Sequence, residues 1–272
     1  MARAAHHPLP AHLATARAPW AWAWAGAGLG LLAASTLFAP APWLASLVFA
    51  ASHGQVQLHE ARGSLWTGSG QLALTGGRGS ADAVALPGPV SWTLRPAWGG
   101  LNLHLQADCC TPVPLALQIR WLRWTGVQLS LADGQSSWPA NLLAGLGTPW
   151  NTVQARGQLA ATSEGLQLQW AQGRMELQGQ LRLDALNVSS RLSTLVPMGS
   201  YRLSLAGGAT PTLSLQTLSG SLQLQGQGQW VGQRLRFSGV ASAEPDRVEA
   251  LSNLLNIVGR RDGARSLITL GS

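Results

Sequence analysis

The stretch Leu166-Gln-Leu-Gln-Trp170 alternates apolar and polar side chains, and Gly179-Gln-Leu-Arg-Leu183 does the same a few residues later. A period of two places every Leu or Trp of a strand on one face and every Gln, Arg or Ser on the other. After residue 52 the pattern recurs at 55–58, 70–74, 101–105, 127–131, 201–205 and 220–224. Gly, Asp-Gly and Pro separate these runs, as they do in successive hairpins. The pattern predicts an all-β body of many short antiparallel strands, about ten to fourteen.

Each of these strands has one apolar face, and that face must be covered. The sheet could fold over on itself as a sandwich or roll, or it could bend into an open curved groove lined by Leu and Trp. The sequence leaves both arrangements open. An open apolar groove would suit an acyl chain, whereas a closed core would bind nothing.

The N-terminal region has the composition of a membrane anchor. Residues 18–59 contain no Asp, Glu, Lys or Arg, and residues 20–39 read WAWAWAGAGLGLLAASTLFA. As a helix this run would span about 30 Å, the hydrocarbon thickness of a bilayer. Pro40 and Pro42 are expected to end the helix, because proline lacks the N–H that an interior turn needs. We therefore expect one transmembrane helix within residues 18–43, with these tryptophans at the membrane interfaces: Trp20, Trp22, Trp24 and Trp43.

The arginines near this helix set its expected orientation. Arg3 and Arg17 precede the apolar run, and none follows it closely. The positive-inside rule then places residues 1–17 in the cytoplasm and the β domain, residues 44–272, in the periplasm. A cleaved signal peptide is the alternative, but its apolar region would normally be about 7–15 residues long, shorter than this run.

Near the C-terminus the period changes from two to between three and four. Pro245, Asp246 and Glu249 suit a first helical turn. An apolar stripe follows, which predicts a helix over 246–259 that packs on the core: Val248, Leu251, Leu254, Leu255 and Val258. Gly259 is expected to form its left-handed cap. Asp-Gly at 262–263 then turns the chain into a last strand at 266–270.

Residues that carry chemistry are few. Charged residues make up 11% of the chain, no Lys is present, and the net charge of +7 is spread along the sequence. A nucleic-acid-binding protein would concentrate its cations on one face or run. The catalytic motifs of zinc proteases, serine hydrolases and nucleotide-binding enzymes are all missing. We therefore expect no enzyme activity, catalytic residue, metal site or cofactor site.

Cys109 and Cys110 are adjacent. Their Cα atoms must lie about 3.8 Å apart, below the usual range for disulfides, so a bridge between them is strained. A vicinal disulfide, two free thiols and intermolecular bridging all stay open. Zinc is not expected, because the chain has no second cysteine pair.

Four phrases of the sequence carry a family resemblance. They are ARGSLWTGSG at 61–70, LPGPVSWTLRP at 86–96, TLSGSLQLQGQGQW at 217–230 and ALSNLLNIVGRRDGARS at 250–266. With the N-terminal anchor, they resemble the type II secretion system protein N family. The likeness covers residues 20–271, and its most specific part is NLLNIVGRRDG near the C-terminus.

The resemblance implies an accessory or scaffold component of the cell inner membrane that supports export of folded proteins from the periplasm across the outer membrane. It implies other type II secretion components and inner-membrane lipid as partners, without cofactor, nucleic acid or small-molecule substrate. A second reading is a lipid-binding groove protein resembling the AsmA-like family of inner-membrane-anchored β proteins. A periplasmic enzyme would need a polar pocket with convergent His or acidic residues.

Overall fold

The computed structural model describes residues 20–80, 82–122, 126–232 and 234–271. The chain divides into two compact units, Met1–Ala39 and Pro40–Ser272. In the first unit the described residues form helix α1 (Trp20–Leu37). The second unit, which contains all the strands, begins four residues before the expected start of the β domain at residue 44.

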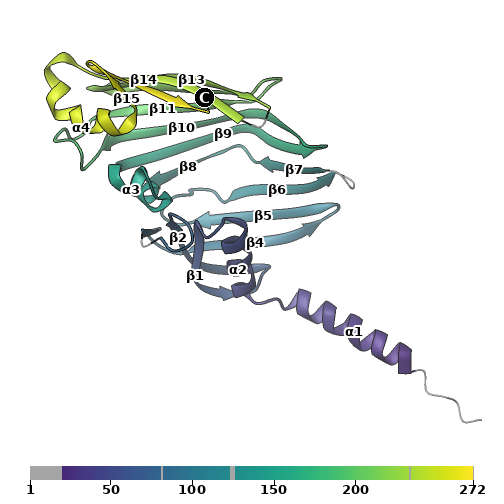
Figure 1. Ribbon diagram of the computed structural model, residues 1–272. Helices are drawn as coiled ribbons and strands as arrows, with labels where there is room; N and C mark the ends of the chain where they lie inside the picture. The colour runs from purple at the N-terminus through teal and green to yellow at the C-terminus, as the bar shows by residue number, and fades with distance from the viewer. Residues whose placement is uncertain (1–19, 81, 123–125, 233, 272) are drawn as a thin grey trace, which may run out of the picture. The chain divides into compact units, whose positions relative to one another are not determined.

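The described residues of the second unit form sixteen strands and several short helices (Figure 1). The helical segments are α2 (Ala41–Ala51), η1 (Ala140–Leu146), α3 (Trp150–Val153), η2 (Pro245–Arg247) and α4 (Val248–Val258). The strands of the first half are β1 (Val56–Gly63), β2 (Thr67–Thr75), β3 (Ala83–Ala85), β4 (Val90–Ala97), β5 (Gly100–Ala107), β6 (Leu115–Leu122), β7 (Gly126–Leu131) and β8 (Gly134–Pro139). Those of the second half are β9 (Arg156–Ala171), β10 (Arg174–Ser189), β11 (Gly199–Ala206), β12 (Thr212–Gly220), β13 (Leu222–Val231), β14 (Arg234–Ala243), β15 (Arg260–Asp262) and β16 (Arg265–Leu270).

All these strands belong to one open antiparallel sheet. Its order is β1-β2-β4-β5-β6-β7-β9-β10-β11-β12-β13-β14-β16-β15, with β3 paired to β2 and β8 paired to β9. Nearly every strand thus pairs with the next strand along the chain, as the repeated hairpins predicted. The all-β, antiparallel prediction is confirmed, and the open form is the one adopted. The strand number exceeds the expected ten to fourteen because short strands such as β3, β8 and β15 lack a clear alternating run.

The long strands β9 and β10 bend where two glycines meet. The pairing register shifts between Gln178 and Gln180. Gly165 and Gly179, with φ of +57° and +79°, face each other there, and a Cβ on Gly179 would overlap the carbonyl of Gly165. Bulges of this kind bend a strand and increase its twist. The two glycines therefore help to curve the sheet at its centre.

Helix α2 corrects one expectation about the N-terminal region. Pro40 and Pro42 were expected only to end a helix; α1 does end before them, at Leu37, but Pro40 also caps the start of α2 and Pro42 lies in its first turn. Proline suits a first turn because the N–H groups there have no intrahelical partner. Pro40 also forms an isolated β-bridge with Ser64. The helix packs along β1, so it belongs to the body.

Helix α1 is shorter than the segment expected to cross the membrane, because it ends at Leu37 and a separate helix follows. Within the described parts of the chain, no helix is both long enough and apolar enough to cross a membrane. The three tryptophans and three glycines of α1 lower its mean hydropathy. The helix expected over residues 20–39 is present as α1, and its insertion in a membrane stays a prediction.

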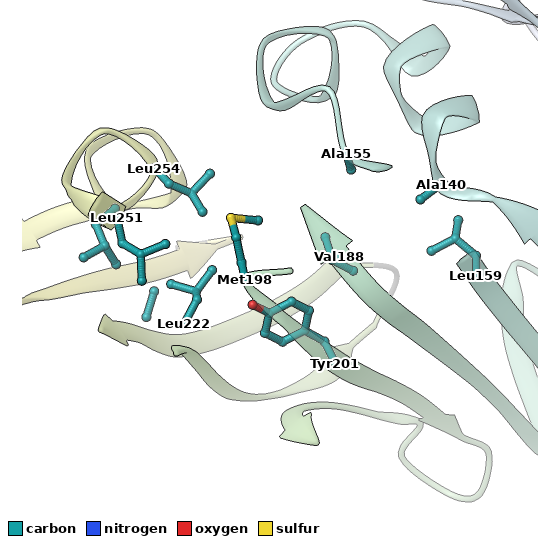
Figure 2. Close-up of a cluster of buried hydrophobic side chains, with 11 residues drawn as sticks. Ala140, Ala155, Leu159, Val188, Met198, Tyr201, Leu222, Leu251 and Leu254 are labelled. Atoms are coloured by element: carbon teal, nitrogen blue, oxygen red, sulfur yellow. The ribbon is translucent and has the colours of Figure 1, made fainter. Parts of the chain in front are cut away.

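The apolar face of the sheet is covered at one end of the strands, called here the helix end, where β4 begins and β14 ends. Two clusters of buried side chains lie there. The smaller includes Leu86, Val90, Ala107, Cys110 and Leu142. The larger joins side chains from β9 to β16 and α4, among them Met198, Tyr201, Leu222, Leu251 and Leu254 (Figure 2).

Helix α4 closes this end of the sheet over β14 and β16. Leu251, Leu254 and Leu255 are at most 2% exposed, which confirms that the apolar stripe packs on the core. Ser266 of β16 donates a hydrogen bond to the carbonyl of Leu255 and so fixes the helix to the last strand. Gly259 is extended rather than left-handed, with φ of −170°. It leads directly into β15, which is why the expected cap is not formed.

Candidate functional site

The apolar face continues beyond the buried clusters into the middle of the sheet. Register places a row of apolar side chains side by side across β5, β6, β7, β9 and β10: Leu101, Ile119, Leu129, Leu168 and Leu177. We call it the leucine row. Apart from Leu177, which is buried, its members are only half-buried. These strands contact their neighbours within one sheet. Among the described residues, no second sheet therefore covers this row.

A second row lies two residues further from the helix end. Trp121, Val127, Trp170 and Met175 are in register across β6, β7, β9 and β10. The two tryptophans are 53% and 49% exposed. Trp121 donates its backbone N–H to the carbonyl of Gly99 at 2.9 Å, which places the β4–β5 turn beside it. Trp98 in that turn is fully exposed.

These three tryptophans, Trp98, Trp121 and Trp170, are called the tryptophan rim. They lie where β4, β6 and β9 end and the chain turns back, which we call the hairpin end. In Figure 1 this is the right-hand side of the sheet, opposite α3 and α4. The apolar face is thus covered at its helix end, half-exposed in the middle, and bordered by exposed tryptophans at its hairpin end.

An open hollow of about 970 Å³ lies near the hairpin ends of β12, β13, β14 and β16. Its lining mixes apolar groups such as Leu213, Phe237 and Leu270 with polar ones such as Gln227 and Arg236. A Cβ on Gly226 would overlap the Phe237 ring, so the ring packs against glycine backbone there.

Of the residues that the sequence singled out, the described tryptophans lie in two different units. Trp20, Trp22 and Trp24 belong to α1 and are 69%, 80% and 73% exposed, whereas Trp43 lies in the first turn of α2. Arg3 and Arg17 lie outside the described residues. Cys109 and Cys110 are joined in a vicinal disulfide in the turn after β5. Cys110 is buried in the smaller cluster, so the bridge holds that turn against the core.

Ionisable side chains connect different parts of the sheet. Asp133 accepts a hydrogen bond from the backbone N–H of Gly165 at 2.5 Å and so ties the β7–β8 turn to the bend in β9. Asp184 pairs with Arg202 on the polar face, and the Arg202 hydrogen bond holds the pKa of the Asp184 carboxyl below its usual range. The described residues contain no group of three or more His, Cys, Asp or Glu side chains that could hold a metal ion.

Sequence reasoning missed the tryptophan rim, although a signal for it exists. Trp98 directly precedes Gly-Gly, and Trp170 stands three residues before Gly173. A Trp at the last position of an alternating run, just before a turn, must lie at the end of a strand. The register between strands was needed to show that these positions meet at the same end of the sheet.

Comparisons with known proteins identify the family of this chain. The sequence model of the type II secretion system (T2SS) protein N family matches residues 54–268, which is most of the chain and nearly all of the sheet. The same comparisons find no match among curated proteins or solved structures. Protein N is a secretion component, and its family is not a known enzyme family. On the match over 54–268, the chain belongs to the type II secretion system protein N family.

Proposed function

We propose that this protein is a scaffold component of the type II secretion system, held at the cell inner membrane by its N-terminal region, with its sheet in the periplasm. The observation that carries the proposal is the family match across residues 54–268. In this role the protein contacts other secretion components and catalyses no reaction. The open surface of the sheet mixes apolar and polar side chains, which suits contacts with partners better than it suits catalysis.

Three features support the membrane location. Residues 18–59 carry no ionisable acid, Lys or Arg, and Arg3 and Arg17 stand on the N-terminal side alone. Helix α1 is apolar all round and has no buried residue. The apolar surface of such a helix must be shielded from water, either by protein or by lipid. Its 18 residues would extend about 27 Å, close to the thickness of the hydrocarbon core, about 30 Å.

A pair of fusions tests the location. A reporter active only in the periplasm should work when fused after Ser52 and fail when fused at Met1. Recovery of a soluble periplasmic form that begins near Pro40 would show cleavage instead of anchoring. For the secretion role, cells lacking the protein should export less of a reporter exoprotein, and the full chain should restore export. Unchanged export without the protein would contradict the scaffold role.

The open apolar face favours a second candidate function, a lipid-binding groove, which is what the resemblance to the AsmA-like family implies. A closed sandwich would bury the leucine row, whereas four of its five members are half-buried and the adjoining tryptophans are about half exposed. About 25 cal/mol is gained per Å² of apolar surface removed from water, so an acyl chain along this row would be stabilised.

Native mass spectrometry separates the two candidates. A groove protein purified in mild detergent should carry lipid adducts, and delipidation should remove them. Leu129→Gln on the leucine row should weaken these adducts, whereas Gln128→Ala on the opposite face serves as the matched control. A chain that carries no adduct in either form would leave only the scaffold candidate.

A further inference from the structure

The hairpin end of the sheet combines exposed tryptophans with arginines. The segments that form it beside the tryptophan rim are 95–100, 119–122 and 169–174. They contain Arg95, Arg120 and Arg174 and no acidic residue. Trp at the level of the lipid head groups, with Lys or Arg beside it, is the usual composition of a protein surface at a membrane interface.

The helix end differs because it carries both signs of charge. Arginines such as Arg156, Arg247 and Arg265 lie there together with six of the eleven acidic residues: Asp82, Asp108, Glu244, Asp246, Glu249 and Asp262. Anionic lipid attracts cations and repels carboxylates. If the sheet approaches an anionic membrane, the charges therefore favour approach by the hairpin end.

The covalent connection to the N-terminal region lies at the hairpin end. Pro40, the first residue of the second unit, bridges Ser64 in the β1–β2 turn. The indole N–H of Trp92 reaches the carbonyls of Ser64 and Leu65, at 3.3 and 3.2 Å, and holds that turn against β4. Trp43, 57% exposed, donates its backbone N–H to the carbonyl of Pro40. The chain that leads to α1 therefore leaves the body beside the hairpin turns.

We propose that the tryptophan rim is a membrane-binding edge, which docks on the anionic head groups of the bilayer that α1 enters. The inference rests on the proposed anchoring and adds an orientation: the strands end at the lipid surface and α4 points away from it. In this position the half-exposed apolar face opens at the membrane. Each arginine near an anionic surface contributes about 1 kcal/mol, which corresponds to about a five-fold change in the docked fraction.

The test uses the full chain in vesicles and one environment-sensitive label. Because the described residues include no free cysteine, Ala97→Cys provides a single labelling site at the end of β4, next to Trp98. Val196→Cys, 79% exposed in the loop between β10 and β11, is the matched site at the helix end. Vesicles of phosphatidylcholine with and without phosphatidylglycerol carry a lipid-borne quencher in the head-group region.

We expect the label at residue 97 to be quenched in phosphatidylglycerol vesicles, less so at high salt, and the label at 196 to stay unquenched. Arg120→Gln and Arg174→Gln should each lower the docked fraction about five-fold. Arg156→Gln, at the opposite end of β9, should leave it unchanged. Thermal unfolding of each variant confirms that it is folded.

Each of four other outcomes would contradict a different part of the inference. If the chain floats with the vesicles and neither label is quenched, the anchor stands and the rim does not dock. Quenching at both sites would mean that the sheet lies flat on the membrane. A label at 97 that is protected only when another secretion protein is added would assign the rim to a protein partner. A chain that fails to float with vesicles would refute the anchoring itself.

Discussion

Asp184 on β10 and Arg202 on β11 face each other across the polar side of the sheet. The guanidinium donates from Nε to Oδ1 and from Nη2 to Oδ2, each at 2.7 Å. This hydrogen bonding lowers the pKa of Asp184 in the folded protein. A carboxyl with a lowered folded-state pKa stabilises the fold above its unfolded pKa, about 3.9, and the contribution is lost as the pH falls through the folded-state value.

We therefore expect Asp184→Asn to lower the melting temperature by a few degrees at neutral pH. The difference from wild type should begin to shrink below about pH 4, where the unfolded-state carboxyl takes up a proton, and it should be lost once the pH falls below the lowered folded-state pKa. Thermal unfolding as a function of pH measures this. Arg202→Lys, which keeps the charge but not the paired donors, should give a smaller loss. A difference that stays constant down to the lowest pH would assign the effect to packing.

Tyr201 is a second informative residue. It is 6% exposed, and among the described residues its hydroxyl has no hydrogen-bond partner. Burial also raises the pKa of the phenol. A buried hydroxyl without a partner costs about 1–3 kcal/mol. Tyr201→Phe should therefore keep or raise the free energy of unfolding, by up to about 1 kcal/mol. A loss of stability in denaturant titration would reveal a partner for the hydroxyl in solution.

Among the elements, α4 depends most on one stripe of side chains. Leu251 is completely buried against the larger cluster, whereas Ile257 on the same helix is 40% exposed. Leu251→Ala should destabilise the protein by about 3 kcal/mol, from lost burial and the cavity left behind. Ile257→Ala should cost less than about 1 kcal/mol. Equal losses in thermal unfolding of the full chain would mean that α4 does not use this stripe for packing.

The elements also show what the sequence could predict. Alternation identified the long strands, because a period of two persists wherever one face is apolar and the other polar. The stripe from Val248 to Val258 identified α4 for the same reason with a helical period. Helix α2 was missed because Pro40 and Pro42 suit both the end of one helix and the start of the next. Only the packing of α2 along β1 shows which role they have.

For the whole molecule, the apolar face could be predicted from the sequence, but which part of it is covered could not. Leu168 and Leu222 stand in runs of similar pattern, Leu-Gln-Leu and Leu-Gln-Leu-Gln. Their environments differ because α4, which begins only at Val248, packs at the helix end and leaves the middle uncovered. The local sequence pattern around each leucine gives no information about that distant contact. The tryptophan rim was missed for a similar reason, since it depends on register across several strands.

These two leucines give the decisive test of an open sheet. Leu222 is 2% exposed within the larger cluster, so Leu222→Arg would bury an unpaired charge and should abolish folding. Leu168 is half-buried in the leucine row, where the long arginine side chain can extend its charged group into water. Leu168→Arg should therefore fold, with a melting temperature near that of wild type, while lipid adducts decrease. Proteolytic stability and native mass spectrometry of both variants measure the two effects. If Leu168→Arg unfolds as completely as Leu222→Arg, the apolar face is closed in solution, and both the groove and its opening at the membrane would have to be abandoned.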